Sequence, residues 1–485
     1  MIESREICIN ELQSSLKECI EDGYGVVCMY ATEKGDMPRT IQTVLRKEDS
    51  IMHITTDLIS DDYLSISMDQ PIFRSYEREM QEMNGLNPIG LKNHGPQRIM
   101  WRYKDGYALQ KGELPEERYA VPLRDNGVSG EGVFEIPVGP VHAGVIEPGH
   151  FRFSVAGEPI IKVRAHLGYV HRNVERLMET SASKDNVRLI ERVSGDSAVA
   201  NALAYAHAME GDSEIPYRAK LLRVIFAELE RISCHFGDIC GIAQDTGFIV
   251  PAVTGAALKE KVLRLNEIIG GHRFLMGTVV PGGVRWDISE SNLDAIKKRI
   301  LKIDFDLEDL MKMLDDATLF ADRIETTGIL TYENAVKFRA LGPVARAAGI
   351  KTDVRKEMPY DAYGDLGLKL ITASNGDVCS RLHVKANEIR ESVSLINQCL
   401  DKIENGPLRV RIEPKDGFGI GLVEASRGEL MHAVNIVNGN IWRYKIRDPS
   451  FVNWSVLERV LPNNIVPDFP LINKSFNLSY SGNDL

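Results

Sequence analysis

Apolar residues in the first part of the chain change from helical to strand-like spacing. Leu12, Leu16 and Ile20 recur every four positions and predict a helix over residues 11–21. Residues 25–30 are almost continuously apolar, which predicts a buried strand. Further strands are expected at residues 40–45, 51–55 and 63–68, and a helix is expected at 76–83. The pattern predicts a small α+β unit.

A polar, glycine-dotted stretch at residues 111–132 is typical of a linker between domains. Beyond it, strand-like segments are expected at 134–138, 151–155 and 159–165. From residue 184 to 399 apolar positions recur at threes and fours, as at Leu293, Ile296 and Ile300, which predicts mainly helices. Alternation at Leu408, Val410 and Ile412 predicts a returning strand, followed by a final helix and an extended tail.

These patterns predict an α+β fold built from two domains. The first, residues 1–110, is a small α+β domain, and residues 111–132 are the linker. The second, residues 133–485, is mainly helical, with an N-terminal β-hairpin and a small C-terminal β element.

Net charge and the distribution of apolar residues exclude several classes of binding partner. The formal net charge of -11 argues against a general nucleic-acid or anionic-lipid surface, which clustered Lys and Arg would attract. No apolar stretch approaches the roughly 20 residues of a membrane-spanning helix, and the charged N-terminus lacks a secretion signal. We therefore expect a cytoplasmic chain that reaches a membrane only through partners. The 7 cysteines form no C-x-x-C pair and are expected to be reduced, mostly buried thiols.

Two blocks resemble known families. Residues 76–86 resemble a segment of the 30-kDa-type subunit of respiratory complex I. The second domain resembles the 49-kDa-type subunit of complex I and the large subunits of group 4 nickel-iron hydrogenases. The matching runs are residues 139–142, 147–152, 167–172, 342–346, 353–356, 359–363, 424–430 and 447–451. Fusion of the two units is similar to the arrangement in hydrogenases of the formate hydrogenlyase and hydrogenase-4 type.

The resemblance implies a place in a membrane-associated redox complex, peripheral on the cytoplasmic face of the inner membrane. The partners it implies are an iron-sulfur small subunit of the complex I 20-kDa type, a ferredoxin-like subunit and antiporter-type membrane subunits. Iron-sulfur clusters are expected in those partners, with no cofactor bound directly by this chain except an optional quinone.

The cysteines that hold nickel in these hydrogenases are missing. The resemblance places the two C-x-x-C pairs at Ser194 and Ser197 on a long helix, and at Ser479 and Gly482 near the C-terminus. A neutral hydroxyl is a hard ligand and glycine has no side chain, so neither replaces a thiolate around nickel. Cys234 and Cys240 lie six positions apart and face different ways on a helix. We expect no metal site and no hydrogen turnover.

A quinone site is implied only in part. His150 matches the histidine that contacts the quinone headgroup in the complex I relative, whereas the matching tyrosine position is Gly195. An imidazole can donate a proton near neutral pH, or His150 hydrogen-bonds loop backbone instead. Glu147 resembles the proton-path acid of the family.

Two further charged residues are candidates for lining the vacated cavity. Asp196 is expected either to pair with His150 or Arg427, or to be solvated or to cap a helix N-terminus. Arg427 is expected either to bind an anionic or quinone-like group or to anchor the C-terminal strand. Packing or interface roles are expected for His142, His171, His207, His235, Arg346 and Arg355.

Three functions remain open from the sequence. The first is a large subunit that takes part in electron transfer coupled to ion movement without a nickel-iron centre. The second is a non-catalytic scaffold that docks an iron-sulfur subunit against the membrane arm. The third is a working hydrogenase, which the four substituted positions argue against.

Overall fold

The computed structural model describes residues 2–34, 37–92, 97–99, 101–114, 116–121, 127–142, 146–181 and 186–485. The chain forms two compact units. The first comprises Met1–Gly157, Ile161–Arg176 and Asn483–Leu485, and the second comprises Glu158–Ile160 and Leu177–Gly482. The linker predicted at residues 111–132 falls within the first unit, and the domain division drawn from the sequence stays a prediction.

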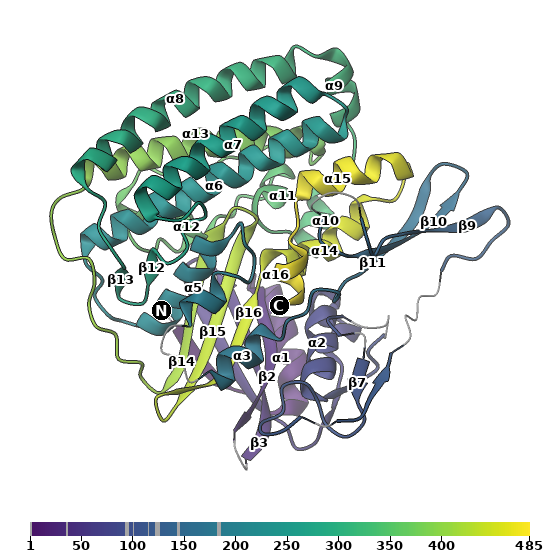
Figure 1. The fold of residues 1–485 in the computed structure, drawn as a ribbon. Helices are drawn as coiled ribbons and strands as arrows, with labels where there is room; N and C mark the ends of the chain where they lie inside the picture. The colour runs from purple at the N-terminus through teal and green to yellow at the C-terminus, as the bar shows by residue number, and fades with distance from the viewer. Residues whose placement is uncertain are drawn as a thin grey trace. The chain divides into compact units, whose positions relative to one another are not determined.

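A four-stranded sheet with the order β1-β4-β3-β2 is the centre of the first unit (Figure 1). Its strands are β1 (Ile2–Glu6), β2 (Gly25–Lys34), β3 (Met37–Lys47) and β4 (Ser50–Asp57). Strand β1 is parallel to β4, whereas β3 is antiparallel to both β2 and β4. Helix α1 (Ile9–Glu21) confirms the predicted helix and buries Leu12, Leu16 and Cys19, whereas Ile20, the third residue of the predicted spacing, is half-buried. The predicted strands 25–30, 40–45 and 51–55 are confirmed.

The strand predicted at residues 63–68 is wrong in its second half. The structure has a short strand β5 (Asp62–Leu64) and then a 3-10 turn, Ile66–Met68. The buried Glu77 carboxylate accepts the main-chain N–H of Ile66 at 2.8 Å and of Ser67 at 3.2 Å. Because these N–H groups bond to a side chain, they cannot join a β-ladder, and the strand ends.

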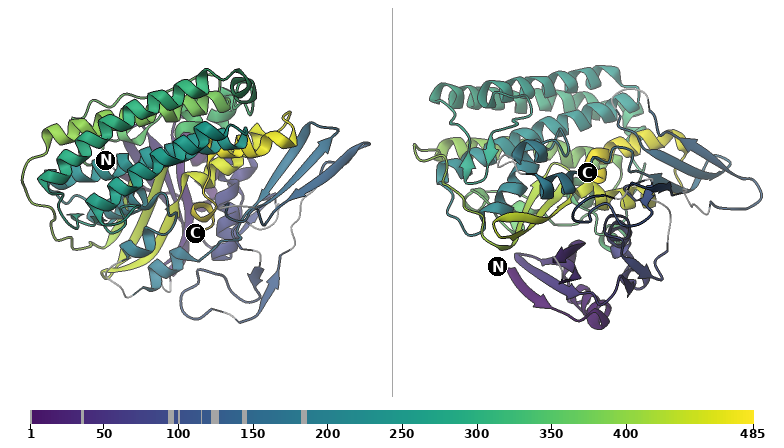
Figure 2. Two further views of the ribbon diagram at one scale, coloured as in Figure 1. Left: turned by 45° about the horizontal axis from the view of Figure 1, so that its top comes forward. Right: turned by 60° about the horizontal axis from the view of Figure 1, so that its bottom comes forward.

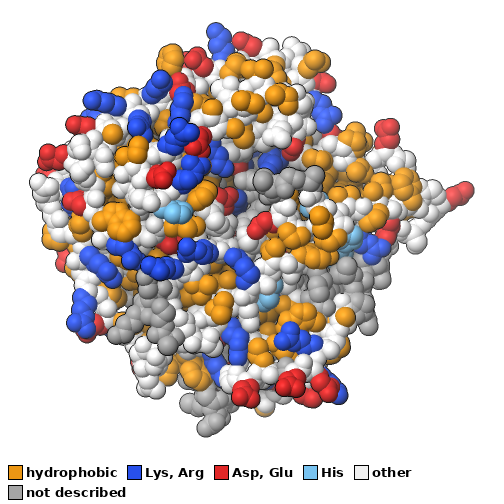
Figure 3. Space-filling model, in the orientation of Figure 1, with side chains coloured by type: hydrophobic (Ala, Val, Ile, Leu, Met, Phe, Trp, Pro, Cys, Tyr) orange, Lys and Arg blue, Asp and Glu red, His pale blue; other side chains and the backbone are white. Residues whose placement is uncertain are grey.

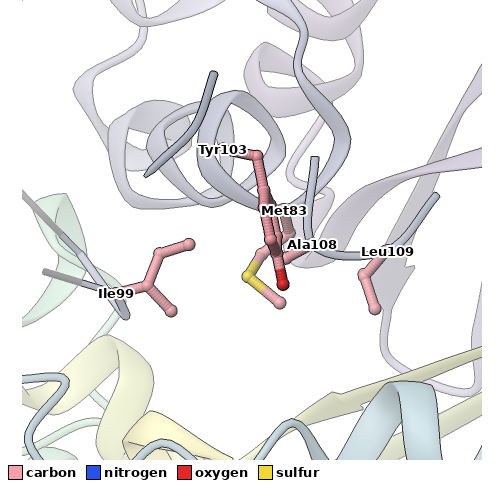
Figure 4. Packing of buried hydrophobic residues seen from close by; sticks show 5 residues of the cluster. All are labelled: Met83, Ile99, Tyr103, Ala108 and Leu109. Atoms are coloured by element: carbon pink, nitrogen blue, oxygen red, sulfur yellow. The ribbon is translucent and has the colours of Figure 1, made fainter. Parts of the chain in front are cut away.

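Helix α2 (Arg74–Asn84) lies where residues 76–83 predict a helix. Beyond it come the short pairs β5 with β6 (Asn87–Ile89) and β7 (Trp101–Tyr103) with β8 (Arg118–Ala120). A cluster of buried apolar side chains lies at the C-terminal end of α2 (Figure 4). Its members are Met83, Ile99, Tyr103, Ala108 and Leu109.

Three strands follow, with the order β11-β10-β9, and confirm the predicted strands at 134–138, 151–155 and 159–165. They are β9 (Val133–Val138), β10 (His150–Ala156) and β11 (Ile160–His166). Helix α3 (Val174–Thr180) comes next.

Four long helices form the bundle of the second unit: α6 (Tyr217–Asp245), α7 (Ile249–Gly270), α8 (Glu290–Asp315) and α13 (Val378–Lys402). Helix α6 contacts α7 and α13, and α8 contacts the same two, so the four close on one another (Figures 1 and 2). Shorter helices are α4 (Val187–Ile190), α5 (Ala198–Glu210), α9 (Thr318–Ile324), α10 (Tyr332–Lys337), α11 (Gly342–Ala347) and α12 (Val354–Glu357). Among the described residues, no helix is both long and apolar enough to cross a membrane.

An antiparallel sheet of β14 (Gly417–Ala425), β15 (Gly428–Val437) and β16 (Asn440–Arg447) packs against α5. Gly421 permits the close contact, because a Cβ added there would lie 2.0 Å from the carbonyl oxygen of Ala204. A Cβ at Gly419 would likewise lie 2.2 Å from the carbonyl oxygen of Ala208. The two glycines let the backbone of α5 lie directly on β14.

The C-terminal part corrects two predictions. The strand expected around Leu408, Val410 and Ile412 is only an isolated bridge between Arg409 and Gly283, and the sheet begins later, at Gly417. The predicted final helix is α14 (Pro449–Val460), but the tail after it is not extended and forms α15 (Phe469–Phe476) and α16 (Tyr480–Asp484). Asp448 caps α14 by accepting the Ser450 N–H, and Pro449 occupies the first turn. The α+β fold class is confirmed.

Candidate functional site

Two distant segments of the second unit meet at the positions where the resemblance places nickel ligands. Ser194 and Ser197 lie between α4 and α5, and Ser479 and Gly482 lie at the start of α16. The Oγ atoms of Ser194 and Ser479 are 2.9 Å apart and hydrogen-bonded. Ser479 Oγ also accepts the Gly482 N–H at 2.9 Å. The hydroxyl groups therefore bond to one another and to the backbone.

A bidentate ion pair lies beside these hydroxyls. Arg427, in the turn between β14 and β15, donates from Nη1 to Asp196 Oδ1 at 2.9 Å and from Nη2 to Asp196 Oδ2 at 2.5 Å. Its Nη1 also donates to Ser197 Oγ at 3.0 Å, and its Nε donates to the carbonyl oxygen of Asn477. Ser194 Oγ donates to Asp196 Oδ1 at 3.0 Å. The Asp196–Arg427 pair thus links the segment before α5, which holds Ser194 and Ser197, to the segment before α16, which holds Asn477 and Ser479.

The ion pair fixes the charge of both partners. The Arg427 side chain is 8% exposed, and that of Asp196 is 34% exposed. Burial alone raises the pKa of Asp196, but the charge of Arg427 and its hydrogen bonds outweigh burial and hold that pKa well below its usual value. Asp196 is therefore ionised at neutral pH. Of the alternatives for Asp196 and Arg427, the structure contains the carboxylate–guanidinium pair.

The fourth position has no room for a larger residue without rearrangement. A Cβ added at Gly482 would lie 2.6 Å from Asp448 Oδ2 and 3.0 Å from Ser479 Oγ. The Asp448 carboxylate is held there because it caps α14. Three hydroxyls, one of them bonded to a guanidinium, and a crowded glycine do not match the thiolate set of a nickel-iron cluster.

One cysteine does lie near this site, but as a thiol. Cys234 on α6 is buried and donates from Sγ to the carbonyl oxygen of Asp196 at 3.0 Å. Burial raises the pKa of Cys234 to about 12, and the charges of Asp196 and Glu230 act in the same direction. All 7 cysteines are free. Within the described part of the chain, no three His, Cys, Asp or Glu side chains are grouped as a metal site.

His150 and Glu147 belong to the first unit. His150 begins β10, and its Nδ1 lies 3.3 Å from the carbonyl oxygen of Gly139. Its ring stacks on that of His166, with 5.9 Å between the ring centres. Glu147 is half-buried. Because Asp196 belongs to the other unit, a pair between His150 and Asp196 stays a prediction.

Two further histidines of the first unit that were singled out in the sequence, His142 and His171, lie against backbone carbonyl groups. His142 Nε2 lies 2.8 Å from the carbonyl oxygen of Gly149, and His171 Nδ1 lies 2.6 Å from that of Asp484. Burial lowers the pKa of His171. These contacts fit packing roles.

A buried ionic network in the second unit was not predicted from the sequence. At one end, Glu228 on α6 accepts from Arg355 at 3.0 Å, from Arg231 at 3.2 Å and from the Tyr363 hydroxyl at 2.5 Å. Burial alone raises the pKa of Glu228, but the two guanidinium groups outweigh it and lower that pKa. Glu228 is therefore a buried carboxylate held ionised by its partners.

Arg346 on α11 is the other centre of the network. Its guanidinium donates to Glu388 on α13 at 2.8 Å and to Glu424 on β14 at 2.7 Å, and it lies 3.4 Å from Asp353. Glu388 also contacts His235 Nε2 at 2.9 Å. Arg346, for which a packing or interface role was expected, is thus the shared cation of three buried carboxylates.

His207 belongs to a second buried group. Its Nε2 lies 3.0 Å from Asp361 Oδ2, and Arg223 joins Asp361 to Glu210. This group ties α5 and α6 to the loop after α12.

A separate pocket of about 1020 Å³ opens between α5, the β12 (Val279–Val280) region and the β15–β16 turn. Arg285, Arg409 and Arg411 line it, and none of the predicted site residues does. Figure 3 shows that Lys and Arg side chains gather in a band on one face, although the chain is acidic overall.

Comparison of the sequence with known proteins identifies the family that the resemblance implied. The family described as "Respiratory-chain NADH dehydrogenase, 49 Kd subunit" matches residues 245–416 and 410–484. Formate hydrogenlyase subunit 5 of Escherichia coli is 30% identical over 447 residues, with 89% of this chain and 79% of that protein covered. Hydrogenase-4 component G of the same organism is 31% identical, with 90% and 78% covered.

A third relative is the carbon monoxide-induced hydrogenase of Rhodospirillum rubrum, which is 31% identical, with 71% of this chain and 97% of that protein covered. Residues 133–485 are 353 of the 485 residues, about 73% of the chain, so the two Escherichia coli matches, which cover 89% and 90%, must also include residues before 133. The chain therefore belongs to the complex I 49-kDa subunit family and is a protein of the group 4 hydrogenase large-subunit type.

Proposed function

We propose that this chain is the large subunit of a membrane-associated redox complex that works without a nickel-iron cluster. The observation that carries the proposal is the contact of Ser194 Oγ with Ser479 Oγ at 2.9 Å, at two of the four ligand positions. A soft metal cluster needs thiolates between these segments, and here hydroxyls bond directly across the gap. The Asp196–Arg427 pair supplies the charges of the site in place of metal and thiolate.

The wider role that we propose is electron transfer coupled to ion translocation. Curated relatives include one component of the F(420)H(2) dehydrogenase of Methanosarcina mazei and one component of the NADH-quinone oxidoreductase of Ehrlichia canis. These names support a redox role outside hydrogen chemistry. The partners we propose are an iron-sulfur small subunit, a ferredoxin-like subunit and antiporter-type membrane subunits, with the chain peripheral on the cytoplasmic face of the inner membrane.

His150 is the residue that we propose as proton donor to a quinone-like acceptor. In its imidazolium form His150 carries a proton on both ring nitrogens: Nδ1 donates to the Gly139 carbonyl oxygen at 3.3 Å, which orients the ring, and Nε2 gives its proton to the acceptor. Glu147, three residues earlier, is the proposed source of the replacing proton.

The test is reduction of dye and quinone by the purified complex. His150→Ala is expected to lower the rate about 100-fold, because a positioned general acid contributes at least about that factor. The matched control is His272→Ala, which removes an exposed histidine in the loop after α7. An unchanged rate in His150→Ala overturns the role of His150. Absence of activity with every donor and acceptor favours the scaffold function instead.

A further inference from the structure

The segment of residues 408–413 has the alternation of a strand but is paired along only one edge. Next to it, β12 and β13 (Gly283–Val284) form a small antiparallel hairpin, and β12 contacts α5 (Figure 1). The isolated bridge between Gly283 and Arg409 adds the segment to the side of β13 that faces away from β12. The segment therefore extends the hairpin and lies at its outer edge.

Two main-chain hydrogen bonds hold the segment against β13. The Val284 N–H donates to the Leu408 carbonyl oxygen at 3.0 Å, and the Val410 N–H donates to that of Gly282 at 3.0 Å. Gly282 and Gly283 permit this approach, because a Cβ at either position would lie 2.1 Å from a main-chain carbonyl oxygen of the segment. The inner edge of the segment is thus fixed by close packing of two backbones.

The outer edge of the segment is open. The main-chain N–H and C=O of Arg409 point away from β13, because the bonded groups belong to its two neighbours. Within the described residues, nothing bonds to the main-chain groups of Arg409 or Arg411. The apolar residues at 408, 410 and 412 are half-buried and the charged residues at 409, 411 and 413 are exposed, as in an extended strand. Such an edge can accept a further strand.

Both arginine side chains of the segment keep donors for a ligand. Arg409 donates from Nε to the Pro281 carbonyl oxygen at 3.2 Å, and its Nη atoms bond to none of the described residues. Arg411 lies 3.3 Å from Glu413, with side chains that are 88% and 77% exposed. An ion pair this exposed contributes little, so another carboxylate can replace Glu413. The edge therefore offers two guanidinium groups, two residues apart.

The segment also lines the pocket of about 1020 Å³, whose remaining lining includes α5 and the β15–β16 turn. Charged side chains alone protect a strand edge from unwanted pairing, but protection of this kind does not require a cavity beside the edge. A pocket at the upper end of the usual range of about 300–1,000 Å³ has room for several residues of a peptide. Of its two acidic residues, Glu179 already bonds to Arg443 at 3.0 Å, so positive charge is in excess.

We propose that this edge binds an extended, acidic segment of a partner protein, which adds as a strand beside Arg409 and Arg411. Main-chain groups of the added strand bond to the open N–H and C=O groups of both arginines. Because the two guanidinium groups are two residues apart, the added strand carries an acidic residue at every second position. The alternation of residues 408–412 predicts a strand, and the partner completes it. This inference is independent of the redox activity proposed above.

Fluorescence anisotropy with the full-length chain tests the interaction, using a labelled peptide in which glutamate and valine alternate. We expect saturable binding that weakens about tenfold in the double variant Arg409→Gln, Arg411→Gln, because two cross-strand charge pairs are lost. Arg390→Gln, which changes an exposed arginine of α13, is the matched control and is expected to bind like the wild type. A wild-type chain that does not bind the peptide, or a double variant that binds it equally well, would overturn the proposal.

Two N-methylated peptides separate strand addition from simple attraction between charges. One is methylated at the glutamate amides and the other at the valine amides, so each loses the N–H groups of one edge and keeps every carboxylate. Because an added strand pairs along one edge, one of the two peptides is expected to bind at least about tenfold more weakly, and the other like the parent. Equal affinity of the two methylated peptides would contradict strand addition.

Hydrogen exchange tests the same edge without any substitution. The N–H groups of Arg409 and Arg411 are expected to exchange at least about tenfold more slowly when the glutamate–valine peptide is bound, because each gains an acceptor. Citrate, which supplies carboxylates without a backbone, is the control and is expected to leave both rates unchanged. If the bound peptide also leaves both rates unchanged, the site binds anions only and the proposal is wrong.

Discussion

Replacing Arg346 with alanine is expected to lower the free energy of unfolding by about 3–5 kcal/mol, the usual cost of removing one partner from a buried ion pair. The Arg346 side chain is 1% exposed and contacts Glu388, Glu424 and Asp353. Without it, three buried carboxylates lose their shared cation. Urea unfolding at pH 7, followed by circular dichroism, measures the change.

Arg299→Ala is the control for this prediction. Arg299 is exposed on α8, and surface substitutions usually change stability by less than about 0.5 kcal/mol. If Arg346→Ala also lowers the free energy of unfolding by less than about 1 kcal/mol, the buried network does not hold the second unit together as described.

The second large effect is expected at Arg427. Arg427→Ala should lower the free energy of unfolding by about 2–3 kcal/mol, less than a fully buried pair because Asp196 is 34% exposed and solvent screens its charge. Arg427→Lys keeps the charge but not the bidentate geometry, so about half of the loss is expected to remain. A double-mutant cycle with Asp196→Asn isolates the interaction, and a coupling energy near zero would contradict the pair.

The pH dependence of this interaction has a defined sign. The folded pKa of Asp196 is depressed below the unfolded value of about 3.9, so its stabilisation is fully present above that value. It is lost as the pH falls through the folded pKa. The difference in free energy of unfolding between wild type and Asp196→Asn should therefore be constant above about pH 5 and shrink toward lower pH. A difference that grows on acidification would contradict this assignment.

The helices of the bundle could be predicted from the sequence because each repeats apolar residues on one face. Ile296 and Ile300 predict α8, and both are fully buried. A final helix was predicted in the C-terminal part, followed by an extended tail, whereas the structure has three helices there, α14, α15 and α16. The last two were missed because they have only 8 and 5 residues, too few for a hydrophobic repeat to predict a helix.

The sequence predicted which residue types occupy the candidate site, but not the contacts that these residues make. The substitutions at Ser194 and Ser479 are visible in the sequence, but the hydrogen bond between them depends on a fold that joins residues 285 positions apart. The burial of three polar and charged residues of α6 was not predicted from the sequence. Glu228, Arg231 and His235 recur at three and four positions, a charged stripe that solvent-exposed helices also show. They are 0–1% exposed because α6 packs against α13 and because Arg231 donates to the carbonyl oxygens of Glu424 and Ala425 on β14.

Asn477 connects the ion pair to the buried network. Its carbonyl oxygen accepts from Arg427, and its side-chain amide donates to Asp238. Asp238 pairs with Lys385 at 2.7 Å and lies 3.8 Å from Nδ1 of His235, which belongs to the network. The four substituted positions thus lie in a continuous set of polar contacts. An arrangement of this kind places fixed protein charges where the relatives named as hydrogenases are expected to place a metal centre.

Nickel content of the purified complex tests the central claim most directly. Elemental analysis should give nickel far below one atom per chain, because three hydroxyls and a glycine offer no thiolate to a soft metal. A stoichiometric nickel signal, with anomalous scattering between residues 194–197 and 479–482, would contradict the account.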